Sequence, residues 1–104
     1  MSVLLEFSIF PLDQGESVGS QVSEVVKLIR KSGVDHQVTA MGTLIETDSI
    51  AQALALVKQA GELLQGEGCR RIYATLKLDI RDGGRGRLQS KTLSVTQHIG
   101  DIST

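Results

Sequence analysis

Aromatic side chains and cysteine are scarce in this chain of 104 residues. Phe7, Phe10 and Tyr73 are its only aromatic residues, and it contains no tryptophan. Proteins that stack single-stranded nucleic acid on exposed rings need a richer set of aromatic side chains. Cys69 is the only cysteine, so the chain cannot form an internal disulfide, and we expect a cytoplasmic protein.

The chain also lacks an excess of charge of either sign and a long hydrophobic run. Eleven basic and twelve acidic residues give a formal net charge of −1, which argues against a large basic surface for nucleic acid. No apolar run approaches the roughly 20 residues of a membrane-spanning helix. The apolar N-terminal stretch contains Glu6 and no basic residue before it, unlike a signal peptide. We therefore expect one domain over residues 1–104, with no nucleic-acid or membrane partner.

Hydrophobic periodicity predicts six elements in the order β-α-β-β-α-β. Residues 3–10 and 69–81 alternate between apolar and polar side chains, as half-buried strands do. Two amphipathic helices are expected between Ser17 and Gly33 and between Ser49 and Gly66, with Gln52 completing a capping box after Ser49. This order predicts a ferredoxin-like α+β sandwich, in which two helices cover one face of an antiparallel sheet and leave the other face open. A short additional C-terminal helix is expected from residue 88 to 99.

Residues 38–47 are expected to form a β-hairpin. Gly42-Thr43 suits its two-residue loop, because a type II′ turn favours glycine at its first central position. This register places Thr39 opposite Glu46 and directs both away from the helices. It requires three hairpin residues to enter the core: Val38, Ala40 and Ile45. The open face then carries five large apolar residues among its polar ones: Leu4, Phe10, Met41, Leu44 and Tyr73. A surface this apolar is seldom left bare, so we expect a second subunit, a ligand or both to cover it.

The second helix is expected to bury one row of residues, Ile50, Leu54, Val57, Gly61 and Leu64, widened by Leu56, Ala60 and Leu63. In the last strand we expect five residues to face inward: Ile72, Ala74, Leu76, Leu78 and Ile80.

Three stretches of the sequence resemble a known family. They are residues 6–18 (EFSIFPLDQGESV), 32–46 (SGVDHQVTAMGTLIE) and 70–81 (RRIYATLKLDIR). Together they resemble the MTH1187/YkoF-like thiamine-binding proteins, also called UPF0045 or DUF77, over nearly the whole chain up to about Arg81. The resemblance implies a ferredoxin-like fold and homo-oligomers, with dimers that often pair into tetramers by packing their sheets. It also implies binding of thiamine or its hydroxymethylpyrimidine part, without catalysis.

Two positions depart from the family pattern. Ala40 stands where relatives often have proline. The loop from Gly83 to Arg87 is rich in glycine and arginine, unlike the charged loops usual there, so no role is transferred to it. It lacks the Gly-Lys-Ser/Thr of a phosphate loop. We interpret it as a flexible surface loop, in preference to an anion-binding lid or a nucleic-acid contact.

The candidate ligand site comprises Ser8, Thr39, Thr43, Glu46 and Asp79. A carboxylate can accept the amino hydrogens of an aminopyrimidine and stabilise the positive charge of thiamine. Hydroxyl groups can meet the ring nitrogens, and an aromatic or methionine side chain can cover the face of the ring. The alternative for Glu46 is an acid at a subunit interface, paired with Lys77 or Arg81.

Other polar residues have two interpretations each. Lys77, Asp79 and Arg81 share one face of the last strand, where they either bind an anion or position Glu46, or, as we prefer, form salt bridges at a subunit interface. For Cys69, one interpretation is a thiol whose pKa is lowered by the neighbouring Arg70 and Arg71. The other is an ordinary buried thiol.

A metal site or a cofactor is not expected. His36 and His98 are far apart in the sequence, and neither has a partner at metal-ligand spacing.

These observations predict a non-catalytic protein that binds thiamine or hydroxymethylpyrimidine at the open sheet face or at the subunit interface of a dimer or tetramer. The alternative is an assembly domain whose open sheet serves only oligomerisation. An enzyme ranks third, because no nucleophile and base occur at a recognisable spacing.

Overall fold

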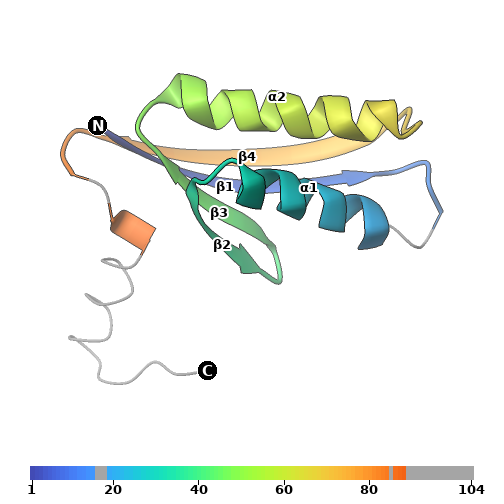
Figure 1. Cartoon of the computed structure of the whole chain (residues 1–104), viewed down its shortest axis with the longest axis horizontal. Coiled ribbons are helices and arrows are strands. Elements are labelled where there is room, and N and C mark those ends of the chain that lie inside the picture. Colours follow the sequence, from blue (N-terminus) through green and yellow to red (C-terminus); the bar gives the residue numbers. More distant parts are fainter. Residues whose placement is uncertain (16–18, 85, 89–104) are drawn as a thin grey trace.

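The computed structural model describes residues 1–15, 19–84 and 86–88. Its elements are β1 (Ser2–Pro11), α1 (Gly19–Lys31), β2 (Asp35–Thr39), β3 (Gly42–Thr47), α2 (Ile50–Gly66) and β4 (Ile72–Arg81). The strands form one antiparallel sheet in the order β2-β3-β1-β4, and both helices lie on the same face of it (Figure 1). This is the predicted ferredoxin-like α+β sandwich. Within the described residues, no helix is long and apolar enough to cross a bilayer.

Two sequence predictions fall partly or wholly outside the described residues. Ser17, where the first helix was expected to begin, is one of them. Of the expected C-terminal helix, only Leu88 is described; it is helical, as is Arg87 before it. The backbone N–H of Arg87 donates to Glu46, which lies on the face of the sheet opposite to α1 and α2.

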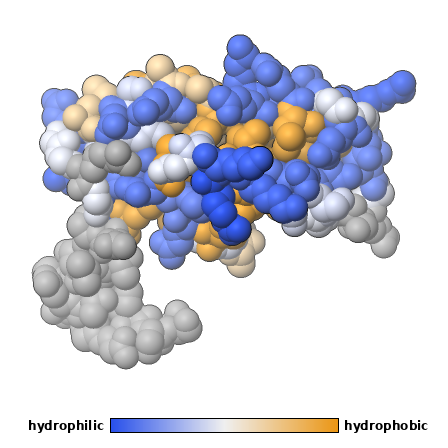
Figure 2. Space-filling model, viewed as in Figure 1, coloured by the Kyte–Doolittle hydropathy of each residue, from blue (hydrophilic) through white to orange (hydrophobic). Residues whose placement is uncertain are grey.

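The core lies between the sheet and the two helices. Every second residue of β1 is buried in it, as the two-residue repeat of a strand requires: Val3, Leu5, Phe7 and Ile9. The helices contribute Val25 and Ile29 from α1 and Ala53, Leu56, Ala60 and Leu64 from α2. Polar residues cover much of the helical side, with apolar surface exposed between them near the middle of the view (Figure 2).

The buried stripe of α2 differs from the expected one. Ala53 and Leu56 are buried, whereas Ile50 and Leu54, which we expected in the core, are exposed. At 3.6 residues per turn, Ile50 and Leu54 lie on one flank of the buried stripe. The expected cap is present: the Ser49 hydroxyl accepts the Gln52 N–H at 3.1 Å, while the Gln52 side chain accepts the N–H of Asp48, one residue before the cap.

The hairpin has a different register from the expected one. Its two-residue loop is Ala40-Met41, because Thr39 pairs with Gly42 and Asp35 with Glu46. The Thr39 hydroxyl holds this loop by donating to the Gly42 carbonyl at 2.8 Å and accepting the Met41 N–H at 3.2 Å. The expected opposition of Thr39 and Glu46 was therefore wrong.

The faces of the hairpin nevertheless agree with the expectation. Glu46 and Leu44 lie opposite Leu4 and Glu6 of β1, on the open face. On the helical side only Ile45 reaches the core as expected, whereas Val38 and Ala40 are exposed.

Gly42 is required by a close approach of two strands, not by the turn. A Cβ built at Gly42 would lie 2.8 Å from the Phe7 carbonyl oxygen, and its φ is +153°, a backbone conformation that other residues rarely adopt. The end of the hairpin can therefore pack against β1 only with glycine at this position.

We predict that Gly42→Ala lowers the free energy of unfolding by about 2 kcal/mol, because it adds both a steric clash and backbone strain. Urea unfolding followed by circular dichroism measures the change. Gly66→Ala is the matched control, since nothing lies within 4 Å of its added methyl group. Equal stability of the Gly42 variant and the wild type would contradict the close approach.

β4 faces the expected way but is poorly covered. Leu76, Leu78 and Ile80 pair with Phe7, Leu5 and Val3, three core residues of β1, so they lie on the helical side. Their exposed fractions are nevertheless 41%, 37% and 47%. β4 forms one edge of the sheet, where the helices shield it less than they shield β1 and β3.

Candidate functional site

Glu46 is fully buried on the open face of the sheet. Its carboxylate accepts the Ser2 hydroxyl at 2.6 Å and the backbone N–H groups of Gly86 and Arg87 at 3.0 and 3.1 Å. A buried carboxylate is tolerated when such donors replace the water it has lost. The chain segment that follows β4 therefore lies over Glu46 and occupies its oxygen atoms.

Arg87 anchors this segment. Its guanidinium donates to the Ser2 hydroxyl at 3.0 Å and to the backbone carbonyls of Ser2 and Asp79, both at 2.7 Å, and it forms a 2.9 Å ion pair with the Asp79 carboxylate. The Arg87 side chain is only 4% exposed. Arg87 therefore joins the ends of β1 and β4, and the Ser2 hydroxyl links it to Glu46. We call Ser2, Glu46, Asp79 and Arg87 the buried polar network.

The surface-loop interpretation of the segment from Gly83 to Arg87 was wrong for Arg87. Sequence reasoning also missed Ser2, and it assigned Asp79 no arginine partner. The only signal in the sequence was an arginine six residues beyond the end of a strand that carries an aspartate. That distance is short enough for the chain to turn back over the sheet edge.

We predict that Arg87→Met lowers the free energy of unfolding by about 2–3 kcal/mol, since it removes several hydrogen bonds from buried partners. Arg70→Met, at an exposed arginine whose backbone N–H donates to the Asp13 carboxylate, should change stability by less than about 0.5 kcal/mol. Urea denaturation of both variants is the measurement. If the two arginine variants are equally stable, Arg87 does not hold the segment in place.

The other three predicted site residues lie at the opposite end of the hairpin. Ser8, Thr39 and Thr43 line a cavity of about 370 Å³, remote from the buried polar network. The structure therefore divides the five predicted residues into two groups. Glu46 and Asp79 flank Leu4 on neighbouring strands, while the three hydroxyl residues line a separate cavity.

This second location, which we call the corner cavity, follows from the unequal lengths of the strands. β3 pairs with β1 only as far as Phe7, whereas β4 pairs with β1 up to Pro11. Among the described residues, Ser8, Ile9 and Phe10 therefore have no strand beside them on the side of β3. The hairpin loop closes this corner from one side and α1 covers it from the helical side.

Most of the lining of the corner cavity is apolar. α1 contributes a row of three valines, Val22, Val25 and Val26, and β1 contributes Phe7, Ile9 and Phe10. Hydroxyl groups come from Ser8, Thr39 and Thr43, and Met41 lies at the loop, 83% exposed. Thr43 is buried on the helical side, opposite Phe7. An apolar cavity with a few hydroxyls and no charged lining residue suits a small, flat and largely neutral ring system.

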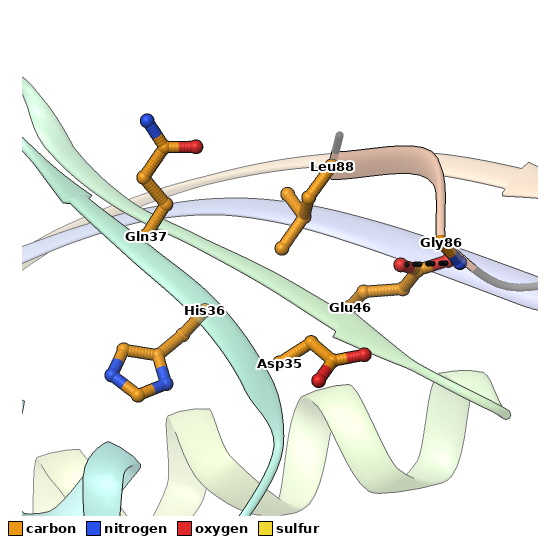
Figure 3. Close-up of a pocket in the computed structure, with 6 residues that line it drawn as sticks. All are labelled: Asp35, His36, Gln37, Glu46, Gly86 and Leu88. Carbon is orange, nitrogen blue, oxygen red and sulfur yellow. Dashed lines mark hydrogen bonds between the residues drawn. The ribbon is translucent and has the colours of Figure 1, made fainter. Parts of the chain in front are cut away.

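A larger cavity of about 530 Å³ lies next to Glu46, between β2 and the chain segment that follows β4. Asp35, Gln37 and Glu46 contribute to it from neighbouring strands, and Gly86 and Leu88 from the segment beyond β4 (Figure 3). Gln37 and His36 project to opposite sides of β2 in this view. The Glu46 carboxylate points toward Gly86 and accepts a hydrogen bond from its backbone N–H (Figure 3).

The remaining polar residues have ordinary partners. Lys77 pairs with Glu6 at 3.7 Å on the open face. The pKa of Cys69 is raised, first by burial and then by the nearby negative charges of Asp13 and Glu67. Cys69 is therefore a buried thiol, and the alternative of a thiol with a lowered pKa was wrong.

The fold and the cavities define a class: a small ferredoxin-like domain with an open sheet and a ligand-sized apolar corner. The sequence matches the family model described as "Thiamine-binding protein" over residues 5–96. The chain therefore belongs to the thiamine-binding protein family, as the resemblance implied.

Relatives agree with this assignment. A UPF0045 protein of Mycobacterium bovis is 37% identical over 99 residues, which cover 95% of this chain and 96% of the relative. A UPF0045 protein of Methanothermobacter thermautotrophicus is 34% identical, covering 93% of this chain and 99% of the relative. Among solved structures, a hypothetical protein from Methanocaldococcus jannaschii superposes with a TM-score of 0.79 at 28% identity, covering 92% of this chain and 97% of that one.

Proposed function

We propose that this protein binds thiamine through its aminopyrimidine part, or binds free hydroxymethylpyrimidine, in the corner cavity and without catalysing a reaction. The observation that carries the proposal is that Ser8, Thr39 and Thr43 line one mainly apolar cavity. Its volume of about 370 Å³ falls in the range of small-molecule sites, about 300–1,000 Å³. Membership of the thiamine-binding family supports the identity of the ligand.

The chemistry of the cavity matches the aminopyrimidine ring in two ways. The ring has flat apolar faces, which the valines of α1 and the side chain of Met41 can cover. Its edge carries an amino donor and nitrogen acceptors, which correspond to the hydroxyl groups of Ser8 and Thr43 and to the backbone of β1 from Ser8 to Phe10 on the side where β3 does not reach. A β-strand edge offers alternating N–H and C=O groups of the kind such a ring can pair with.

Under this proposal Glu46 and Asp79 act on the structure and not on the ligand. The Glu46 carboxylate is fully buried and accepts hydrogen bonds from three donors. Asp79 pairs with Arg87. The positively charged thiazolium ring of thiamine would extend toward the exposed hairpin loop, where water can solvate its charge.

Isothermal titration calorimetry with thiamine and with hydroxymethylpyrimidine tests the proposal. We predict that Ser8→Ala and Thr43→Val each weaken binding by about 2- to 10-fold, the effect of one lost hydrogen bond. Val22→Trp, at the partly exposed edge of the cavity, should abolish binding by filling it. Ser23→Ala and Thr75→Val, outside the cavity, are matched controls and should bind as the wild type does.

Two outcomes would contradict the proposal in different ways. If Ser8→Ala and Thr43→Val bind normally while Glu46→Gln loses the ligand, the site lies beside Glu46 on the open face. If the wild type forms a stable oligomer and releases no heat with either ligand, the protein is an assembly domain. A homo-oligomer in solution is itself part of the proposal.

A further inference from the structure

The backbone polar groups of Ile9 face the corner cavity. Successive residues of an antiparallel strand direct their N–H and C=O groups alternately to one side and the other. The Leu12 N–H donates to the Arg71 carbonyl of the β4 side, so the even-numbered residues of β1 face β4 and the odd-numbered residues face β3. Pairing with β3 ends at Phe7, which lies opposite Thr43. Among the described residues, Ile9 therefore has no strand opposite its N–H and C=O groups.

Pro11 protects the same edge. It is the only proline of the chain, and as an odd-numbered residue of β1 its nitrogen faces the side of β3. Its missing N–H therefore removes no hydrogen bond to β4, which explains how a strand of ten residues accommodates a proline. A further strand along this edge would find no donor at residue 11. From Ile9 to Pro11 the edge thus presents one donor, the Ile9 N–H, and two acceptors, the carbonyls of Ile9 and Pro11.

The corner cavity lies in the plane of the sheet. Ser8 and Phe10 line it from the open face, while Ile9 and the valines of α1 line it from the helical side. Continuing the register of β1 and β3 would place Met41 opposite Ile9, but the chain turns away there through the loop Ala40-Met41. The cavity therefore takes the place of a missing strand residue, and a flat ring can lie in it with one edge against β1.

We propose that Ile9 and Pro11 make this site specific for a ring whose edge carries an amino group next to a ring nitrogen, and that they reject the corresponding oxo ring. The inference rests on the proposed function of the corner cavity. The ring nitrogen accepts the Ile9 N–H, and the amino group donates to the Ile9 carbonyl, as a strand residue opposite Ile9 would. N3 and the 4-amino group of the thiamine pyrimidine form such an edge.

A 4-oxo ring reverses the pattern of this edge. It carries a hydrogen on N3 and an acceptor at position 4, so the Ile9 N–H meets a donor and the Ile9 carbonyl meets an acceptor. If the ring slides toward Pro11, N3–H can donate to the Ile9 carbonyl, but the oxo group then needs an N–H at residue 11, which proline lacks. Pro11 is therefore a specificity-determining residue, because it denies the oxo ring its alternative position.

Turning the oxo ring over restores the match with Ile9 but exchanges the 2-methyl group with the 5-substituent. In the orientation of the amino ring, the 2-methyl group lies on the side of Thr43, where β3 closes the edge. The 5-substituent lies on the other side, where Phe10 and the exposed Met41 line the cavity. The reversed ring would direct the bulky thiazolium group of a thiamine analogue at Thr43, which is buried. The reversed orientation is therefore closed to such analogues.

Thiamine and oxythiamine test this specificity, because oxythiamine carries an oxo group at position 4 and a hydrogen on N3 but is otherwise the same molecule. In isothermal titration calorimetry we expect the wild type to bind oxythiamine about 100-fold more weakly than thiamine, as a site does that meets a two-bond edge with the wrong pattern. The remaining groups of the two ligands are identical, so contacts elsewhere in the cavity do not produce the difference.

Pro11→Ala supplies the missing donor. We expect this variant to bind oxythiamine about tenfold more tightly than the wild type does, the effect of one hydrogen bond gained. Leu12→Ala is the matched control, because its N–H already faces β4, and it should keep the preference of the wild type for thiamine. Circular dichroism verifies that both variants are folded.

The Ile9 amide gives a readout that needs no variant. Its proton resonance should move downfield when hydroxymethylpyrimidine binds to the isotopically labelled wild type, because a ring nitrogen then accepts the N–H. A ligand held only by the hydroxyl groups of Ser8 and Thr43 would not have this effect.

Distinct results would overturn the inference alone or together with the proposed function. Equal affinity of the wild type for thiamine and oxythiamine would overturn the specificity and leave the proposed function standing. So would an Ile9 amide that stays unchanged while that of Thr43 shifts. A folded Pro11→Ala variant without any gain for oxythiamine would remove the role of Pro11. If the wild type binds neither thiamine nor hydroxymethylpyrimidine, the proposed function fails and this inference fails with it.

Discussion

The unequal pairing of β1 with its two neighbours is the constraint on which the rest of the structure depends. β1 pairs through ten residues with β4 but through only five with β3. The long side makes β4 a regular edge strand, and the short side leaves β1 without a described neighbour from Ser8 to Phe10. The corner cavity is the space that this mismatch creates, and α1 covers it because the helix must return from the end of β1 to the start of β2.

The buried polar network stabilises the other end of the same strand. Ser2 begins β1, Asp79 is near the end of β4, and Glu46 is near the end of β3, so the network connects the start of β1 with the ends of β3 and β4. No buried side-chain nitrogen or oxygen of the described residues lacks a hydrogen-bond partner, which is the condition under which a buried charged group does not destabilise a fold. The acid that sequence reasoning assigned to the ligand thus has a structural role in this arrangement.

The sequence was sufficient for the fold and for the two faces of the sheet, but not for the strand register. The alternation of apolar and polar residues fixes which face a side chain occupies. The observed register moves the partner of Glu46 from Thr39 to Asp35, a shift of four residues. An even shift leaves every side chain on the same face, so both registers fit the same alternation of apolar and polar residues. The observed register brings Gly42 close to the Phe7 carbonyl, a tertiary contact that no local pattern reveals.

The sequence predicted which face of the sheet a side chain occupies, but not how deeply it is buried, because burial also depends on whether its strand is central or at an edge. Leu78 and Leu5 have the same character in the sequence and pair directly, yet Leu5 is fully buried and Leu78 is exposed by more than a third. The difference arises from strand order, because β4 is at an edge and β1 is central. Arg87 shows the converse, since an arginine among glycines is expected in solvent but is buried here by partners distant in sequence.

The most direct test of the account is a titration of the isotopically labelled protein with hydroxymethylpyrimidine, followed by amide chemical shifts in nuclear magnetic resonance. The account predicts that the largest changes occur at Ser8, Ile9, Thr43 and Val25, around the corner cavity, while the amides of Asp35 and Glu46 stay in place. Changes concentrated at Asp35, Glu46 and Gly86 would contradict it and move the ligand to the open face.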